Sequence, residues 1–204
     1  MKLLKASALV VSLILLLTSC SQAEQEEAKP AETEITIKPY TLSEKEKVLI
    51  SKTNVQFIEY FVMDGTLKEN DDLIYELEIY ENGELLEEGL GSHGEVKSHF
   101  DDEIISFGIQ DSGTENKVST LLVGMPGGIA STAREHEMTL TGLSKLINDK
   151  ITLEKDKPVY LAAWTGTTQN SLRTIGSENG ELPEGIKEAE LAFVYKIMLI
   201  DEKK

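Results

Sequence analysis

The sequence predicts a mainly β protein: an antiparallel β-sandwich or barrel-like domain with a short N-terminal helix. Apolar and polar residues alternate with a period of two along most of the chain after residue 55, which is typical of half-buried strands. Turn-forming residues separate these runs at intervals of about 8–14 residues, as in all-β sandwiches and barrels. Helical spacing is confined to two short stretches, so helix is expected only in short pieces.

The first predicted element is a short helix over residues 43–53. Ser43 followed three residues later by Glu46 forms the capping-box pattern, in which each side chain satisfies a free backbone amide of the other residue. Val48 and Leu49 would line one side of this helix.

Strands are expected over residues 73–80, 84–90, 105–109, 117–123, 135–141, 151–153, 159–164 and 190–200. Asn82-Gly83 joins the first two strands and suits a type I′ hairpin turn, because both turn positions need positive φ. The last strand is apolar on both faces, so we expect it at the centre of a sheet or under a helix. Apolar residues at helical spacing predict one helical turn over residues 141–148.

The N-terminus has the layout of an export signal. Lys2 and Lys5 precede an apolar run of twelve residues, 6–17, and small residues follow it, as in a cleavable secretory signal. The run is shorter than the roughly 17–25 residues of a transmembrane helix. We therefore expect residues 1–19 to be a signal peptide.

The segment Leu17-Thr18-Ser19-Cys20 resembles the lipobox of bacterial lipoproteins. The resemblance implies that the Cys20 thiol receives a diacylglycerol, that the chain is cut just before Cys20, and that the protein sits on the extracytoplasmic face of the cell membrane. Two acyl chains make a stable anchor, whereas one gives only marginal binding. The chain is similar to the small surface lipoproteins of Gram-positive bacteria. This similarity implies a location at the cell surface and no particular activity.

Residues 20–40 are predicted to form a lipidated, flexible tether, followed by a single extracytoplasmic β domain over residues 41–204. The tether is rich in Glu, Gln, Ala and Lys and has no apolar period beyond Ile35 and Ile37. Such a segment buries too little apolar surface to offset its chain entropy. Its predicted role is to span the distance between the lipid anchor and the domain.

The charge of the chain excludes several classes of partner. The chain has 20 basic and 36 acidic residues; removing the signal takes away Lys2 and Lys5, which leaves 18 against 36 and a net charge of −18. Nucleic acid is not an expected partner, because phosphate binding needs clustered Lys and Arg. Adsorption to anionic lipid is disfavoured on the same ground, so we expect membrane contact through the lipid anchor.

No catalytic residue, metal ligand or cofactor site is predicted. Cys20 is the single cysteine, so its lipidation leaves no thiol for a disulfide, a metal or a nucleophile. The glycines of residues 89–94 match G-x-G-x-x-G, but no strand–helix context for a dinucleotide surrounds them. His93 and His99 have no usual zinc spacing, and His136 has no nucleophile assigned to it.

One stretch has the composition of a binding loop. Residues 164–177 contain the single tryptophan, an arginine and many hydroxyl side chains, and Trp and Arg are enriched at interaction hot spots. The candidate binding residues are Trp164, Gln169, Asn170 and Arg173. In the alternative interpretation, Trp164 is a core residue and the rest is a solvated loop.

The expected function is that of a lipid-anchored extracytoplasmic binding or interaction module at the cell surface. Its partner would be a protein or a component of the cell wall. The alternative is an envelope-associated hydrolase, which would need an acid–base pair with perturbed pKa values in a cleft.

Overall fold

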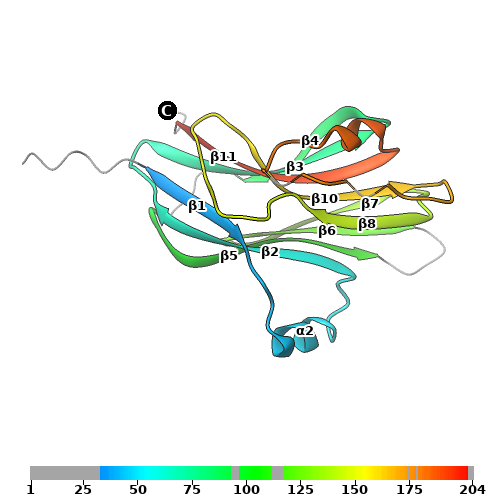
Figure 1. Ribbon diagram of the computed structural model, residues 1–204, viewed down its shortest axis with the longest axis horizontal. Coiled ribbons are helices and arrows are strands. Elements are labelled where there is room, and N and C mark those ends of the chain that lie inside the picture. Colours follow the sequence, from blue (N-terminus) through cyan, green and yellow to red (C-terminus); the bar gives the residue numbers. More distant parts are fainter. Residues whose placement is uncertain (1–32, 93–96, 112–116, 174, 178, 202–204) are drawn as a thin grey trace, which may run out of the picture. The chain divides into compact units, whose positions relative to one another are not determined.

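The chain folds into two open antiparallel sheets that pack face to face (Figure 1). The computed structural model describes residues 33–92, 97–111, 117–173, 175–177 and 179–201. One sheet has six strands in the order β7-β6-β5-β2-β1-β9, and the other has five in the order β4-β3-β11-β10-β8. The predicted fold class is therefore confirmed as a mainly β sandwich, and neither sheet closes into a barrel.

The six-stranded sheet comprises β1 (Glu34–Pro39), β2 (Phe57–Thr66), β5 (His99–Asp111), β6 (Val118–Met125), β7 (Gly128–Glu135) and β9 (Ile151–Thr152). The five-stranded sheet comprises β3 (Asp71–Glu81), β4 (Glu84–Ser92), β8 (Leu140–Lys145), β10 (Val159–Thr167) and β11 (Leu191–Asp201). The helical elements among the described residues are α2 (Glu44–Ile50) and a 3-10 helix, η1 (Glu184–Glu188).

Strand β1 corrects the predicted boundary between tether and domain. Residues 34–39 were expected in the flexible tether of residues 20–40, yet they pair antiparallel with β2 over their whole length. Ile35 and Ile37 are both 0% exposed. Their alternation is short, but it points both side chains into the core, and the domain begins at Thr33.

The pairing of β1 with β2 depends on a glycine. Gly65 lies opposite Ile35 with φ +133, in a region that L side chains rarely adopt. A Cβ atom at this position would lie 1.9 Å from the carbonyl oxygen of Glu34. The close approach of the two backbones therefore requires a residue without a side chain.

Two further expectations were wrong. A strand was expected over residues 135–141, but β7 ends at Glu135 and the chain crosses to the other sheet before β8 begins. A helical turn was expected over residues 141–148, where β8 instead pairs with β10 and places Leu143 opposite Trp164. Pairing with a distant strand has overridden a local helical spacing.

The main core lies between the two sheets. At its centre the Trp164 ring stacks on Phe193, with ring centroids 4.7 Å apart, and Phe107 contacts Tyr195 at 5.9 Å. A smaller apolar cluster covers the other face of the five-stranded sheet, where Ile186 of η1 packs with Val194. Strand β11 is thus central and covered on both faces, as its sequence predicts.

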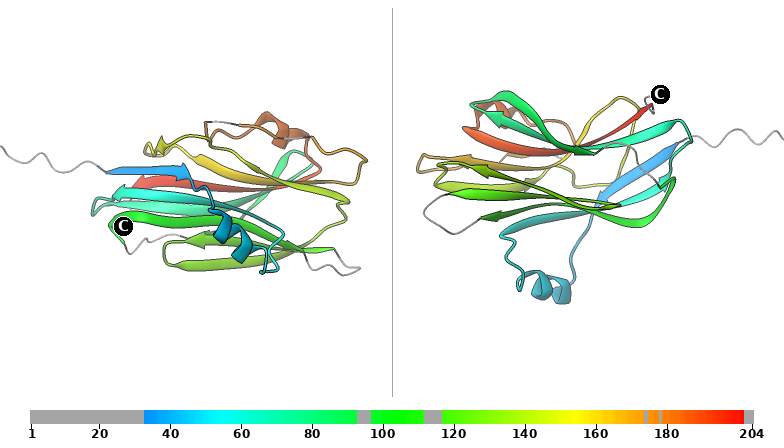
Figure 2. Two further views of the ribbon diagram at one scale, coloured as in Figure 1. Left: turned by 60° about the horizontal axis from the view of Figure 1, so that its bottom comes forward. Right: turned by 180° about the vertical axis from the view of Figure 1, so that it is seen from behind.

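Helix α2 extends away from the sheets between β1 and β2 (Figures 1 and 2). Its predicted capping box is present, with Ser43 and Glu46 bonded reciprocally, and the Tyr40 hydroxyl donates to Glu46 Oε1 at 2.7 Å. No residue of α2 is buried. Within the described residues, no helix has both the length and the apolar character needed to cross a bilayer.

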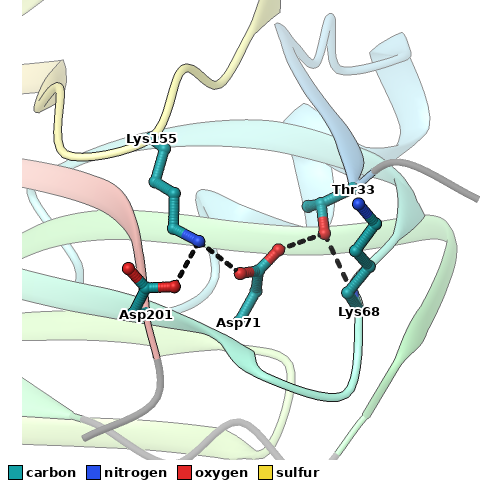
Figure 3. A network of polar contacts seen from close by, with 5 residues as sticks. All are labelled: Thr33, Lys68, Asp71, Lys155 and Asp201. Atoms are coloured by element: carbon teal, nitrogen blue, oxygen red, sulfur yellow. Dashed lines mark hydrogen bonds and ion pairs between the residues drawn. The ribbon is translucent and has the colours of Figure 1, made fainter. Parts of the chain in front are cut away.

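A polar network joins the first described residue to the last strand (Figure 3). The Lys155 ammonium donates to Asp71 Oδ1 at 2.7 Å and also to Asp201 in β11. Asp71 in turn accepts a hydrogen bond from the Thr33 hydroxyl, which accepts one from the Lys68 amide at 3.0 Å. These contacts fix the point at which the chain enters the domain.

Candidate functional site

The candidate site is a pocket where β10 ends and β11 begins. Its volume is about 380 Å³. The lining is mostly polar and comes from the end of β10, the loop that follows it, η1 and the residues before β11: Thr165, Gly166, Thr167, Gln169, Ser171, Leu172, Arg173, Ile175, Gly185, Glu188, Ala189 and Glu190.

Apolar side chains hold the loop over the pocket. Leu172 packs over β8, where a Cβ atom added to Gly142 would lie 3.0 Å from its Cδ2. Ile175 is buried in the smaller apolar cluster, where a Cβ atom added to Gly185 would lie 3.2 Å from its side chain. The loop is thus fixed at two points by packing, and the Arg173 side chain between them remains exposed.

Glu190 places a fixed negative charge on the pocket wall. Its carboxylate accepts hydrogen bonds from the Thr167 hydroxyl at 2.5 Å, the Thr168 amide at 3.0 Å and the Thr168 hydroxyl at 2.8 Å. These bonds, with that of Thr167 the largest contribution, lower the pKa of Glu190 to about 2. The carboxylate therefore stays ionised at any physiological pH.

Arg173 places a positive charge at the rim. Its guanidinium is paired with the Glu188 carboxylate, and the two side chains are 84% and 63% exposed. Exposed ion pairs of this kind contribute little to stability, so Arg173 can exchange Glu188 for a ligand at little cost. The pocket therefore presents a fixed anion, an exchangeable cation and several hydroxyls.

The structure separates the predicted binding residues into three groups. Gln169 and Arg173 line the pocket. Asn170 is exposed on the same loop but is not part of the lining. Trp164 is 0% exposed, because the alternation of β10 points it into the core, in agreement with the alternative interpretation of this residue.

Glu190 was not among the predicted site residues, and no local signal in the sequence identifies it. Its partners Thr167 and Thr168 lie 23 and 22 residues earlier in the chain, and only the antiparallel pairing of β10 with β11 brings them together. Gly166 and Leu191 are opposite residues in that register.

A model of the YgaN domain family matches residues 36–199. The chain belongs to this family. The matched region begins within β1 and ends within β11, so the YgaN domain coincides with the sandwich and includes β1. No curated protein and no solved structure matches the chain.

The YgaN domain also contains an Asp–Ser–His group, which the sequence analysis did not find. The Ser119 hydroxyl donates to Asp111 Oδ1 at 2.5 Å and lies 2.8 Å from His136 Nε2. In a catalytic triad the histidine lies between the other two residues, whereas here the serine does. Ser119 is 0% exposed, so no substrate reaches its hydroxyl.

His136 is neutral in this arrangement. Its Nδ1 accepts the Met138 amide at 3.2 Å, so Nε2 carries the proton that Ser119 accepts. Burial lowers the pKa of His136, and the Asp111 charge opposes this effect only in part. Through Ser119, the group connects His136, just after the end of β7, to β6. The His136 ring also contacts the buried Trp164 ring, with ring centroids 5.4 Å apart.

The remaining sequence motifs lead to no metal or cofactor site within the described parts of the domain. Residues 89–92 of the glycine motif lie in strand β4, while its last two residues, His93 and Gly94, lie outside the described residues. His99 begins β5, and its Nδ1 lies 3.2 Å from the Thr66 hydroxyl. Among the described residues, no group of three His, Cys, Asp or Glu side chains is placed to bind a metal.

Proposed function

We propose that this YgaN protein is a lipid-anchored, extracytoplasmic binding module that holds a polar ligand in the pocket beside residues 169–173. The observation that carries the proposal is the pocket itself. It is concave, it is close in size to small-ligand sites, and polar groups of both charges converge on it. A ligand with both a cationic and an anionic group, such as a peptide, would match Glu190 and Arg173.

The proposed anchor rests on the N-terminal sequence. Leu17-Thr18-Ser19-Cys20 resembles a lipobox, and Cys20 is the single thiol of the chain. The domain begins at Thr33, so residues 20–32 would link the lipid to the sandwich. Such an anchor would hold the binding module at the cell membrane, where its partner would be a protein or a component of the cell wall.

Replacing the proposed lipidated cysteine tests the anchor. In cells grown with radiolabelled fatty acid, Cys20→Ala is expected to lose all label, because no other thiol can accept the diacylglycerol. The same variant should move from the membrane fraction to the soluble fraction. Equal labelling of the variant and the parent chain would rule out Cys20 as the attachment site.

Site-specific photo-crosslinking tests the pocket. A photoreactive amino acid at Gln169, in the lining, should yield a discrete cross-linked product in intact cell envelopes. The matched control is Asn170, which is exposed on the same loop but outside the lining. Arg173→Ala should reduce the yield at residue 169 at least several-fold. The same product in equal yield from both positions would argue against the pocket.

A further inference from the structure

The outer face of α2 combines apolar and basic side chains. Lys45, Val48, Leu49 and Lys52 are spaced i, i+3, i+4 and i+7. The first three therefore share one face of the helix, and Lys52 lies on the same side in the turn that follows Ile50. Val48 and Leu49 are 57% and 60% exposed, and both lysines are exposed beside them. The face is therefore an apolar centre with a positive charge at each end.

The opposite face of α2 faces the sandwich across a groove. Ile50 and Lys47 line a groove against β2 and Leu143. Both acidic side chains of the helix have partners: Glu44 pairs with Lys47 at 2.7 Å, and Glu46 accepts hydrogen bonds from Ser43 and Tyr40. Among the described residues of the domain, the outer face of α2 is thus the one left without a partner.

The charge of this segment differs from that of the whole chain. Residues 43–52 contain three lysines and two glutamates, a net charge of +1, whereas the chain as a whole carries −16. At physiological ionic strength charges are screened beyond about 8 Å. A surface in contact with α2 therefore interacts with the local lysines more strongly than with the distant acidic residues.

We propose that the outer face of α2 lies on the surface of an anionic phospholipid bilayer. Val48 and Leu49 enter the boundary between headgroups and acyl chains, and Lys45 and Lys52 lie beside lipid phosphates, as in interfacial amphipathic helices. The occupant is a membrane because a single seven-residue helix offers far less area than the roughly 800 Å² that each partner buries in a stable protein interface.

The length of the chain allows this contact. Thirteen residues, 20–32, separate the proposed lipid from Thr33, and a fully extended chain spans about 3.3–3.6 Å per residue. A reach of up to about 45 Å lets the domain turn α2 toward the bilayer. The proposal goes beyond the ligand pocket and needs membrane attachment only to bring the helix within reach.

The experiment attaches the full chain to vesicles chemically. Cys20, the single thiol, is coupled to a maleimide phospholipid in vesicles of phosphatidylcholine with a minor share of phosphatidylglycerol. An environment-sensitive fluorescent amino acid replaces Leu49, or Ile129 as a matched control, which is 74% exposed on β7. Because the coupling is chemical, the result does not depend on whether cells lipidate Cys20.

The residue 49 label is expected to shift to the blue and to be quenched by lipids brominated near the headgroup, whereas the residue 129 label should do neither. Lys45→Gln with Lys52→Gln should lower the bound-to-free ratio of the helix about 30-fold, and Arg at both positions should restore it. Identical spectra at 49 and 129 would overturn the proposal. So would a blue shift at 49 that grows with protein density without lipid quenching, which would indicate a second copy on this face.

Discussion

Deleting residues 22–38 is expected to abolish cooperative folding of the sandwich, whereas deleting residues 22–32 should change its stability by no more than about 0.5 kcal/mol. The longer deletion removes the first five residues of β1, which pairs with β2 on one side and β9 on the other. The shorter deletion ends before Thr33, where the domain begins. Thermal unfolding monitored by near-ultraviolet circular dichroism distinguishes the two variants.

Single substitutions locate the effect within β1. Ile37→Ala should cost about 2–5 kcal/mol, since it leaves a cavity at a fully buried position. For a domain of this size, each kcal/mol of lost stability lowers the melting temperature by roughly 2–4 °C. Glu34→Ala, at an exposed position of the same strand, serves as the control and should be close to neutral. A cooperative melt after the longer deletion would show that β1 is dispensable.

Strand β1 illustrates where sequence reasoning reached its limit in the fold. Two alternating isoleucines surrounded by charged residues are too short a pattern to separate a strand from a tether. What decides the matter is a distant partner: Gly65 and Met63 of β2 accept Ile35 and Ile37 in register. The Asn82-Gly83 hairpin, by contrast, is local, and both residues have the positive φ that the sequence predicts.

The same distinction between local and distant signals applies to the candidate site. The loop with Gln169 and Arg173 is visible in the sequence because its composition is unusual. Glu190 is one acid among 36, and its role follows only from the threonines that the sheet brings to it. Hydrogen bonds between residues remote in sequence leave no pattern within a short window.

Net charge describes the chain as a whole and is too coarse to describe a single surface. A charge of −16 opposes general adsorption to anionic lipid or nucleic acid. It does not describe α2, whose exposed lysines lie on a projecting element (Figure 1). Because screening limits electrostatic contact to about one Debye length, the arrangement of charges decides local contacts, and composition alone does not report it.

Lys196→Ala is expected to destabilise the domain by about 3–5 kcal/mol. The Lys196 ammonium lies 2.5 Å from Glu78 Oε1 and 2.9 Å from Glu76 Oε2, on the face of the sheet opposite the main core. The side chains of Lys196 and Glu78 are only 9% and 5% exposed. Removing the cation leaves two carboxylates close together with poor access to water, which is the costly way to break a buried ion pair.

The charged state of Lys196 depends on its partners. Burial alone would lower the pKa of the ammonium, but hydrogen bonds to Glu78 and Glu76 outweigh burial and raise it. The Tyr80 hydroxyl donates to the second oxygen of Glu78 at 2.6 Å, so the carboxylate is well satisfied. The geometry of these hydrogen bonds therefore holds Lys196 and the two glutamates together. Replacing Lys196, Glu76 and Glu78 together with Met or Leu should cost far less stability than Lys196→Ala alone.

Lys155→Ala provides the matched control for this prediction. Lys155 also bridges two carboxylates, those of Asp71 and Asp201 (Figure 3), but its side chain is 40% exposed and that of Asp201 is 74% exposed, while Asp71 is 9% exposed. Solvent reaches the ammonium and Asp201, and Asp71 keeps its hydrogen bond from Thr33, so removing Lys155 should cost about 1–2 kcal/mol, less than removing Lys196. Urea unfolding of both variants at neutral pH measures the difference. Equal losses for Lys196→Ala and Lys155→Ala would mean that water reaches the Lys196 group as freely as it reaches the surface network.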